Sequence, residues 1–164
     1  MKINKSVILT LKEKQTLFKL WNSEYPDKII YSELSEFENY LNELSDQEHY
    51  FLLNDKNEIL GWAFTFMRNE ENWFAIIVSS KIHRKGFGTI LLDELKKNNA
   101  VLNGWAVDHQ NEIKKNKEKY ISPIVFYVKN GFFVNQKIRI ENNKISAVKI
   151  IWKKNRDKYN SDII

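Results

Sequence analysis

The segment from Val78 to Leu92 carries the strongest chemical signal in this sequence. It reads Val-Ser-Ser-Lys-Ile-His-Arg-Lys-Gly-Phe-Gly-Thr-Ile-Leu-Leu, so a basic, glycine-spaced loop separates an apolar strand pattern from an apolar helix pattern. Helix N-termini expose unpaired N–H groups and carry partial positive charge, and glycines let the backbone approach phosphate oxygens closely. Arg84 and Lys85 add positive charge at the mouth of the loop. The segment therefore predicts a phosphate-binding site, although it has neither the P-loop nor the GxGxxG spacing.

Composition limits the other chemistries. The sequence has no cysteine, which excludes a thiolate nucleophile and a disulfide. His49, His83 and His109 lie far apart without metal-ligand spacing, so no metal is expected. The net charge of +5 and the pI near 9.2 favour an anionic partner such as a nucleotide cofactor. No nucleic-acid partner is expected, because no aromatic-basic RNA motif or DNA-reading helix is recognisable.

Hydrophobic periodicity predicts the elements that must position the loop. The run from Trp73 to Val78 is continuously apolar, which is typical of a central strand buried on both faces. Capping-box patterns at Thr10/Glu13 and Ser35/Glu38 indicate two helix starts before it. The other predicted elements are strands at Ser6–Thr10, His49–Asn54, Ile59–Met67, Val101–Asp108, Phe133–Ile140 and Ile145–Trp152, a helix from Gly86 with Phe87, Ile90, Leu91 and Leu95 inward, and a helix between Ser122–Pro123 and Asn130–Gly131.

These elements follow one another in the order β-α-α-β-β-β-α-β-α-β-β. Helices interleaved with strands must cover both faces of one sheet, which predicts an α/β fold with a mixed central sheet of about seven strands. The length fits a single domain over residues 1–164, with residues 153–164 expected to be a flexible basic tail. Neither a membrane-spanning run nor a signal peptide is recognisable, so a cytoplasmic protein without a membrane partner is expected.

The glycine loop resembles the acetyl-CoA motif of the GNAT superfamily of N-acetyltransferases. That motif reads Gln/Arg-x-x-Gly-x-Gly/Ala between a strand and a helix, and His83, Gly86 and Gly88 stand at the matching positions. His83 departs from the family's usual Gln or Arg. The segment Phe126–Phe132 is similar to a second motif of the family, Phe-Tyr-x-Lys-x-Gly-Phe. The resemblance covers nearly the whole chain, from Ser6 to Trp152.

This resemblance implies a GNAT-like fold that transfers an acetyl group from acetyl-CoA, the cosubstrate, to an amine. Backbone groups of the first splayed strand, Ile76, Ile77 and Val78, are then expected to pair with the pantetheine arm and to polarise the thioester carbonyl. Tyr127 is implied as the acid that protonates the leaving thiolate. The loop residues expected to bind the cofactor are His83, Arg84, Lys85, Gly86, Phe87, Gly88 and Thr89.

The general base stays open at the level of the sequence. Asp108 is the catalytic candidate, because it ends the strand that borders the expected opening. The alternatives are His109, Glu70, Glu71 and a chain of water molecules. Three strand tryptophans either line an acceptor pocket or belong to the core, namely Trp62, Trp73 and Trp105.

The segment from His109 to Ile121 is longer than the family's usual connection and carries four lysines. It is either a lid over the acceptor site or a disordered surface insertion. Its lysines would repel a cationic polyamine and favour an acceptor with a carboxylate or a phosphate. The sequence thus predicts an N-acetyltransferase for a primary amine of a small molecule or peptide, with a homodimer as a possible assembly. The alternative is a GNAT-fold module that binds acyl-CoA without turnover.

Overall fold

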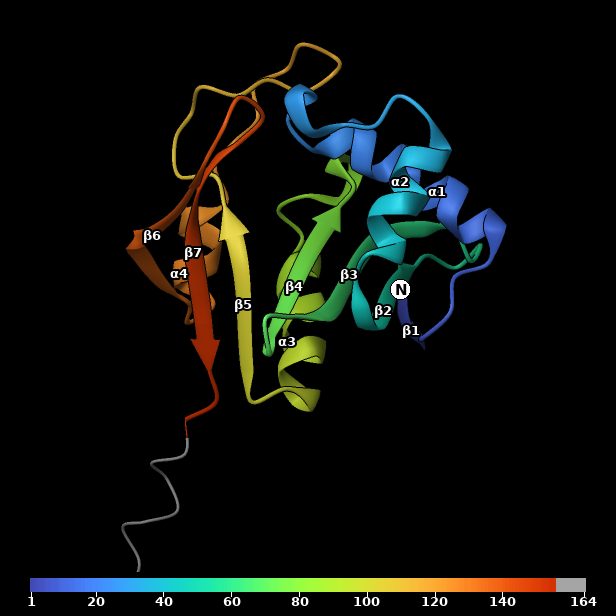
Figure 1. The fold of residues 1–164 in the computed structure, drawn as a ribbon. Coiled ribbons are helices and arrows are strands. Elements are labelled where there is room, and N and C mark those ends of the chain that lie inside the picture. Colours follow the sequence, from blue (N-terminus) through green and yellow to red (C-terminus); the bar gives the residue numbers. More distant parts are fainter. Residues whose placement is uncertain (156–164) are drawn as a thin grey trace, which may run out of the picture.

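The apolar run in the middle of the chain forms an interior strand, β4 (Glu71–Val78), of a seven-stranded sheet. In the computed structural model, which describes residues 1–155, the strands lie in the order β1-β2-β3-β4-β5-β7-β6 (Figure 1). All neighbouring strands are antiparallel except β4 and β5, which are parallel. The other strands are β1 (Lys2–Ser6), β2 (Ser45–Leu53), β3 (Ile59–Arg68), β5 (Val101–Ala106), β6 (Phe133–Glu141) and β7 (Ser146–Lys153).

Helices cover both faces of the sheet, which confirms the predicted α/β class with a mixed sheet. The helices are α1 (Leu11–Glu24), α2 (Leu34–Asn42), α3 (Phe87–Asn98) and α4 (Ile124–Lys129), with short 3-10 helices η1 (Asp27–Ile29) and η2 (Ser80–Ile82). Leu17 and Phe37 bring α1 and α2 into one core, whereas Leu91 and Tyr127 bring α3 and α4 into a second core on the opposite face. No helix within residues 1–155 is long and apolar enough to cross a membrane.

The prediction of a first strand at Ser6–Thr10 is wrong, because β1 ends at Ser6. The Ser6 hydroxyl donates to the carbonyl of Ile8 at 2.6 Å and accepts from the Ile8 N–H at 3.3 Å, which makes a turn there. Thr10 then caps α1, and the Thr10 and Glu13 side chains each accept from the other's backbone N–H. The first predicted capping box is therefore confirmed.

The second helix begins with a different capping pair from the predicted Ser35 and Glu38. Glu36 accepts the backbone N–H groups of Ser32 at 3.0 Å and Glu33 at 3.2 Å. Glu33 is the N-cap residue of α2, so the helix starts two residues earlier than the Ser35 pattern indicated.

Two details of the later helices also differ from the predictions. Ile90 was predicted to face inward but is exposed. Leu92, which was not in the predicted set, is buried instead. The last helix begins at Ile124, one residue later than predicted, with Pro123 as its N-cap residue. The Ser122 hydroxyl donates to the Val107 carbonyl at 2.6 Å and accepts the Ile124 N–H at 3.4 Å.

The chain leaves the sheet later than predicted. Lys153 is the last residue of β7, and the N–H of Lys154 donates to the carbonyl of Ala100 at 2.8 Å. The first residues of the predicted tail thus belong to the sheet, and the remainder, residues 156–164, lies outside the described residues.

The parallel strands β4 and β5 are joined at one end only. Among the described residues, Trp73 and Asn103 form their single ladder pair. Nearby, the Asn72 amide donates to the carbonyl of Val101 at 3.0 Å, and the Asn103 amide donates to the carbonyl of Asn72 at 3.0 Å. Beyond these contacts the strands diverge toward their carboxyl ends (Figure 1). The edge of β4 at residues 76–78 therefore faces an opening rather than a partner strand.

A buried histidine makes the stability of this sheet depend on pH. His49 on β2 is 1% exposed, and its Nδ1 accepts a hydrogen bond from Trp62 Nε1 at 3.2 Å. Burial lowers the pKa of His49 from 6.5 to about 4. The unfolded chain therefore binds a proton at a pH where the folded protein does not, so stability falls as the pH drops through this range.

We predict that the free energy of unfolding falls by about 2 kcal/mol when the pH is lowered from about 7.5 to about 5, because of the protonation of this histidine in the unfolded chain. Urea denaturation at both pH values measures the loss. The variant His49→Gln has no proton to bind, so its loss should be smaller by that amount. Equal losses in both proteins would contradict the prediction.

Candidate active site

A cleft of about 590 Å³ opens where β4 and β5 diverge. It is bordered by the carboxyl end of β4, the amino end of α3, the start of α4, the end of α1 and the 109–121 loop that follows β5. Its lining residues are Glu24, Tyr25, Ile76, Ile77, Val78, Ser80, Ile82, His83, Arg84, Gly86, Phe87, Gly88, Thr89, Lys114, Glu118, Lys119, Tyr120, Ile121, Ser122, Pro123, Phe126 and Tyr127. Every residue predicted to bind the cofactor except Lys85 is among them.

The amino end of α3 has the geometry that anion binding requires. Gly86 is its N-cap residue and has a φ of +81°, a left-handed conformation that favours glycine. A Cβ atom on Gly88 would lie 3.1 Å from Cζ of Phe126, so the missing side chain lets α3 and α4 approach each other. Residues 86–89 all line the cleft, so the unpaired N–H groups of the first helical turn border it.

His83, the departure from the family motif, closes this loop onto β4. Its Nε2 lies 2.7 Å from the carbonyl oxygen of Val78. A carbonyl oxygen can only accept, so Nε2 carries the proton in this contact. The side chain therefore fixes the path of the backbone between the strand and the glycines, and Val78 and His83 both line the cleft.

Tyr127 lies in the cleft and is held by packing. The residue is 6% exposed, and its ring contacts the rings of Phe74, Phe126 and Phe132 at centroid distances of 5.9, 5.2 and 5.3 Å. Burial raises the pKa of Tyr127 well above its ordinary value, and the neighbouring Tyr120 adds to the effect. The hydroxyl is therefore protonated across the physiological range and available as a donor.

Asp108, the base predicted from the sequence, lies outside this cleft. It lines a separate hollow together with Arg139. The Arg139 guanidinium donates to both carboxylate oxygens, at 2.8 and 3.1 Å. These hydrogen bonds lower the pKa of Asp108 below its ordinary value, which makes the carboxylate a weaker base. The structure thus pairs the predicted base Asp108 with Arg139 of β6 and does not bring it to the cleft.

The other base candidates also lie away from the cleft. His109 lines the same separate hollow as Asp108, and its Nδ1 accepts the N–H of Asn111 at 3.2 Å. Glu70 lies in the turn between β3 and β4, and Glu71 begins β4, at the end opposite to the cleft. Lys149 donates to both oxygens of Glu71, at 3.1 and 3.0 Å.

The three strand tryptophans belong to the packing of the sheet rather than to this cleft. Trp62 is fully buried in the core beneath α1 and α2. Trp73 packs in the same core and against Trp105, with ring centroids 5.2 Å apart.

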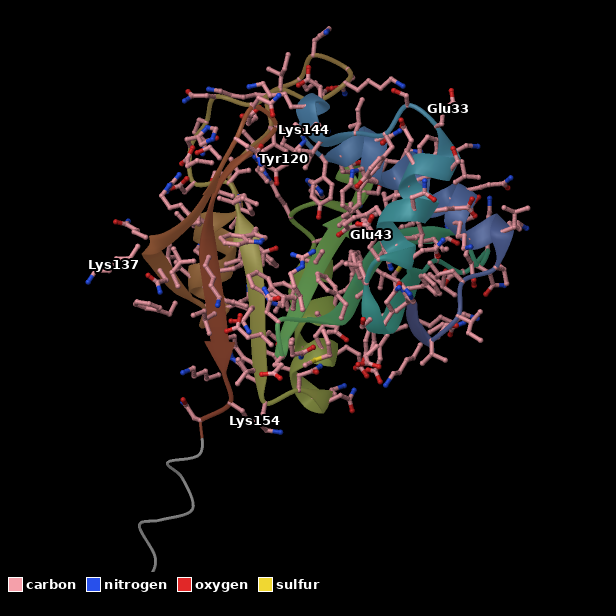
Figure 2. All side chains as sticks on the ribbon, in the orientation of Figure 1. Glu33, Glu43, Tyr120, Lys137, Lys144 and Lys154 are labelled. Atoms are coloured by element: carbon pink, nitrogen blue, oxygen red, sulfur yellow. The ribbon has the colours of Figure 1, made fainter. Side chains whose placement is uncertain are left out.

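The 109–121 loop is folded onto the end of α1 and helps to enclose the cleft (Figure 1). Ile113 and Lys119 form a bridge within it, and the N–H of Asp27 donates to the carbonyl of Ile113 at 2.8 Å. Figure 2 shows Tyr120 on the inner side of the loop, toward the carboxyl ends of β4 and β5. The loop is therefore an ordered wall of the cleft and not an extended surface insertion.

Sequence reasoning missed several residues that share this cleft. Glu24 and Tyr25 come from the end of α1, and Lys114 and Tyr120 come from the 109–121 loop. Burial raises the pKa of Tyr120 to about 12. No local pattern marks these residues, because 90 positions in the sequence separate Glu24 from its partner Lys114.

The comparisons with known proteins agree with this fold. Residues 46–134, more than half of the chain, match the acetyltransferase (GNAT) domain family. The chain belongs to this family of acetyltransferases, whose cosubstrate is acetyl-CoA. No curated protein matches the sequence.

Solved structures with the same fold are distant in sequence. An aminoglycoside 6′-N-acetyltransferase complexed with coenzyme A has a TM-score of 0.69 and 16% identity, covering 93% of this chain and 97% of that one. A putative phosphinothricin N-acetyltransferase has a TM-score of 0.68 and 11% identity, covering 93% and 98%. A spermidine N-acetyltransferase chimera from Vibrio cholerae has a TM-score of 0.65 and 13% identity, covering 93% and 96%.

We predict that the variant Gly86→Asp loses at least about tenfold in acetyl-CoA affinity, because its carboxylate would repel the pyrophosphate. Gly86→Asn is the matched control: Asn has the same size and also tolerates a positive φ, but it is neutral. Calorimetry should show near-normal acetyl-CoA affinity for Gly86→Asn and weakened affinity for Gly86→Asp. If both variants bind acetyl-CoA like the wild type, the pyrophosphate does not sit at this helix end.

Proposed function

We propose that this acetyltransferase moves the acetyl group of acetyl-CoA to a primary amine by direct attack of the amine on the thioester. One observation carries the proposal. A single cleft combines the amino end of α3, the unpaired edge of β4 and the buried Tyr127. These features supply an anion site, a row of backbone donors and a proton donor for one extended substrate.

The proposed reaction uses the two substrates, backbone N–H groups of β4, the Tyr127 hydroxyl and water. The neutral amine nitrogen attacks the acetyl carbon, and the carbonyl electrons move to the oxygen. Backbone N–H groups on the free edge of residues 76–78 donate to this oxyanion. When the intermediate collapses, the carbon–sulfur bond breaks and the amide forms. The sulfur takes a proton from the Tyr127 hydroxyl, and the nitrogen gives its extra proton to water. Water then returns a proton to the Tyr127 phenolate, which restores the enzyme.

The burial of Tyr127 has two opposing effects on this last step. A tyrosine has an ordinary pKa of about 10 and a thiol about 8.5, so proton transfer to a thiolate in water is unfavourable. Burial raises both values, because it disfavours both anions. The thiolate that forms in the cleft is therefore a stronger base than in water. In the proposal, a hydrogen bond from the Tyr127 hydroxyl to the sulfur stabilises the charge as it develops.

The acceptor class follows from the charges at the far end of the cleft. Glu24, Glu118, Lys114 and Lys119 line it, so both signs of charge are present. Aminoglycosides, phosphinothricin and spermidine, named for the structural neighbours, all carry a primary amine that is cationic at neutral pH. The lysines alone would disfavour such cations, but Glu24 and Glu118 offset them.

A thiol-release assay tests the proposed function. The panel is an aminoglycoside, phosphinothricin, spermidine and a peptide with a free α-amine and a lysine. We expect at least one amine to release CoA above the amine-free rate, with the acetylated amine identified by mass spectrometry. Acetyl-CoA binding without release for every amine would favour the non-catalytic acyl-CoA module instead.

The variant Tyr127→Phe should lower kcat about 100-fold and leave the affinity for acetyl-CoA nearly unchanged, because it keeps the packed ring and removes the proton. Tyr50→Phe is the control, since Tyr50 is equally buried but its hydroxyl donates to Glu48 outside the cleft. A loss below about threefold in kcat would mean that Tyr127 only packs. The kcat of Tyr120→Phe would then show whether Tyr120, which also lines the cleft, is the acid.

A further inference from the structure

Glu24 is a buried carboxylate at the end of α1 that faces the cleft. The residue is 9% exposed. Its Oε1 accepts the backbone N–H of Ser80 at 2.9 Å, and its Oε2 accepts from the Lys114 ammonium at 2.9 Å. Ser80 follows β4 by two residues, so Glu24 is anchored beside the strand edge that borders the opening.

Lys114 brings a primary ammonium into the cleft from the 109–121 loop. Its side chain is 11% exposed, and 90 positions in the sequence separate it from Glu24. The loop holds it there through the Pro26–Lys114 bridge and the Lys114 N–H, which donates to the Glu118 carbonyl at 2.8 Å. An amine of the protein itself thus occupies a place in a cleft proposed to receive amines.

The energetics of a buried ion pair favour exchange over simple opening. Leaving Glu24 buried without a cation is costly, because its desolvation is not compensated. Replacing one ammonium with another keeps the carboxylate paired, so the swap avoids that cost. Of the other charged side chains in this part of the cleft, Glu118 and Lys119 are more exposed.

We propose that the Glu24 carboxylate is the subsite for an ammonium group of the acceptor, and that Lys114 fills this subsite until an acceptor displaces it. The inference rests on the proposed function, and it names the substrate class as an amine that carries a second, cationic amino group. The ammonium held by Glu24 has no lone pair, so a different amine of the same acceptor attacks the thioester. Glu24 acts here as an anchor that touches the substrate. Burial alone would raise the pKa of Glu24, but the Ser80 N–H and Lys114 hold it below the ordinary value, so the carboxylate is a weak base.

The two halves of the pair then have opposite effects on the acceptor. Loss of the carboxylate removes the anchor, whereas loss of the lysine removes the competitor. A pair that served only to hold the loop in place would respond in the same direction to either loss. The sign of each change therefore separates the two roles.

The experiment measures acceptor KM, acetyl-CoA affinity and Tm for Glu24→Gln and Lys114→Met, with the best amine of the panel as acceptor. Glu24→Gln should raise the acceptor KM about tenfold or more, since a hydrogen-bonded charge is lost. Lys114→Met should lower it severalfold. Acetyl-CoA affinity should stay within about twofold in both. Lys114→Arg keeps the ion pair, and the guanidinium can donate two hydrogen bonds to the Glu24 carboxylate. Because this competitor is harder to displace, the variant should raise the acceptor KM.

The matched control is the Lys14–Glu38 pair between α1 and α2, with 3.3 Å between Nζ and Oε1. Its variants Lys14→Met and Glu38→Gln should leave both kinetic constants unchanged. If Glu24→Gln and Lys114→Met move the acceptor KM in the same direction, or not at all, the inference is wrong.

A second readout keeps the inference separate from turnover. In the presence of CoA, spermidine and butylamine should raise the Tm of Lys114→Met more than that of the wild type, and should not raise that of Glu24→Gln. This pattern without thiol release would overturn the proposed function and support the subsite. Thiol release without this pattern would support the function and overturn the subsite.

Discussion

The confinement of β4–β5 pairing to one end of the two strands is the constraint on which the site depends. Parallel neighbours need a crossover, and α3 supplies it, which brings its amino end to the carboxyl end of β4. The side chains of Asn72 and Asn103 hold the lower ends together. Phe74 lies over Gly104, where a Cβ atom would come within 2.8 Å of its ring. With the lower end held in this way, the upper ends are free to diverge around a substrate.

The parts of the site that the sequence predicted are those whose geometry is local. Gly86 and Gly88 act through the backbone of a few consecutive residues, so their spacing alone indicates a helix end that can hold phosphate. The sequence did not indicate that Arg139, from β6, binds both oxygens of Asp108. The Ser35 cap failed because a neighbouring carboxylate, Glu36, competed successfully for the same turn. A pattern in one sequence reveals neither an ion-pair partner that is distant in the chain nor a neighbouring side chain that takes the same hydrogen bonds.

The 109–121 loop changes the electrostatics that its composition alone suggested. By its composition, the loop carries four lysines and would repel a cation. In the structure, Lys114 is neutralised by Glu24, and Lys28 lies 3.6 Å from Glu112 of the same loop. The loop therefore brings carboxylates as well as lysines to the sheet. Charge in a folded protein acts through its partners, so composition is a poor guide to what the cleft will accept.

Enclosure of the cleft by the loop also places buried tyrosines around the opening. Tyr25, Tyr120 and Tyr127 surround the opening with aromatic rings, and burial raises the pKa of each of them. A carboxylate among these rings keeps its charge only where it is paired, as Glu24 is by the Ser80 N–H and the Lys114 ammonium. Neutral phenols and backbone N–H groups, by contrast, keep their donor character at low dielectric. We therefore expect such donors, rather than a carboxylate base, to stabilise the oxyanion and the thiolate of the proposed reaction.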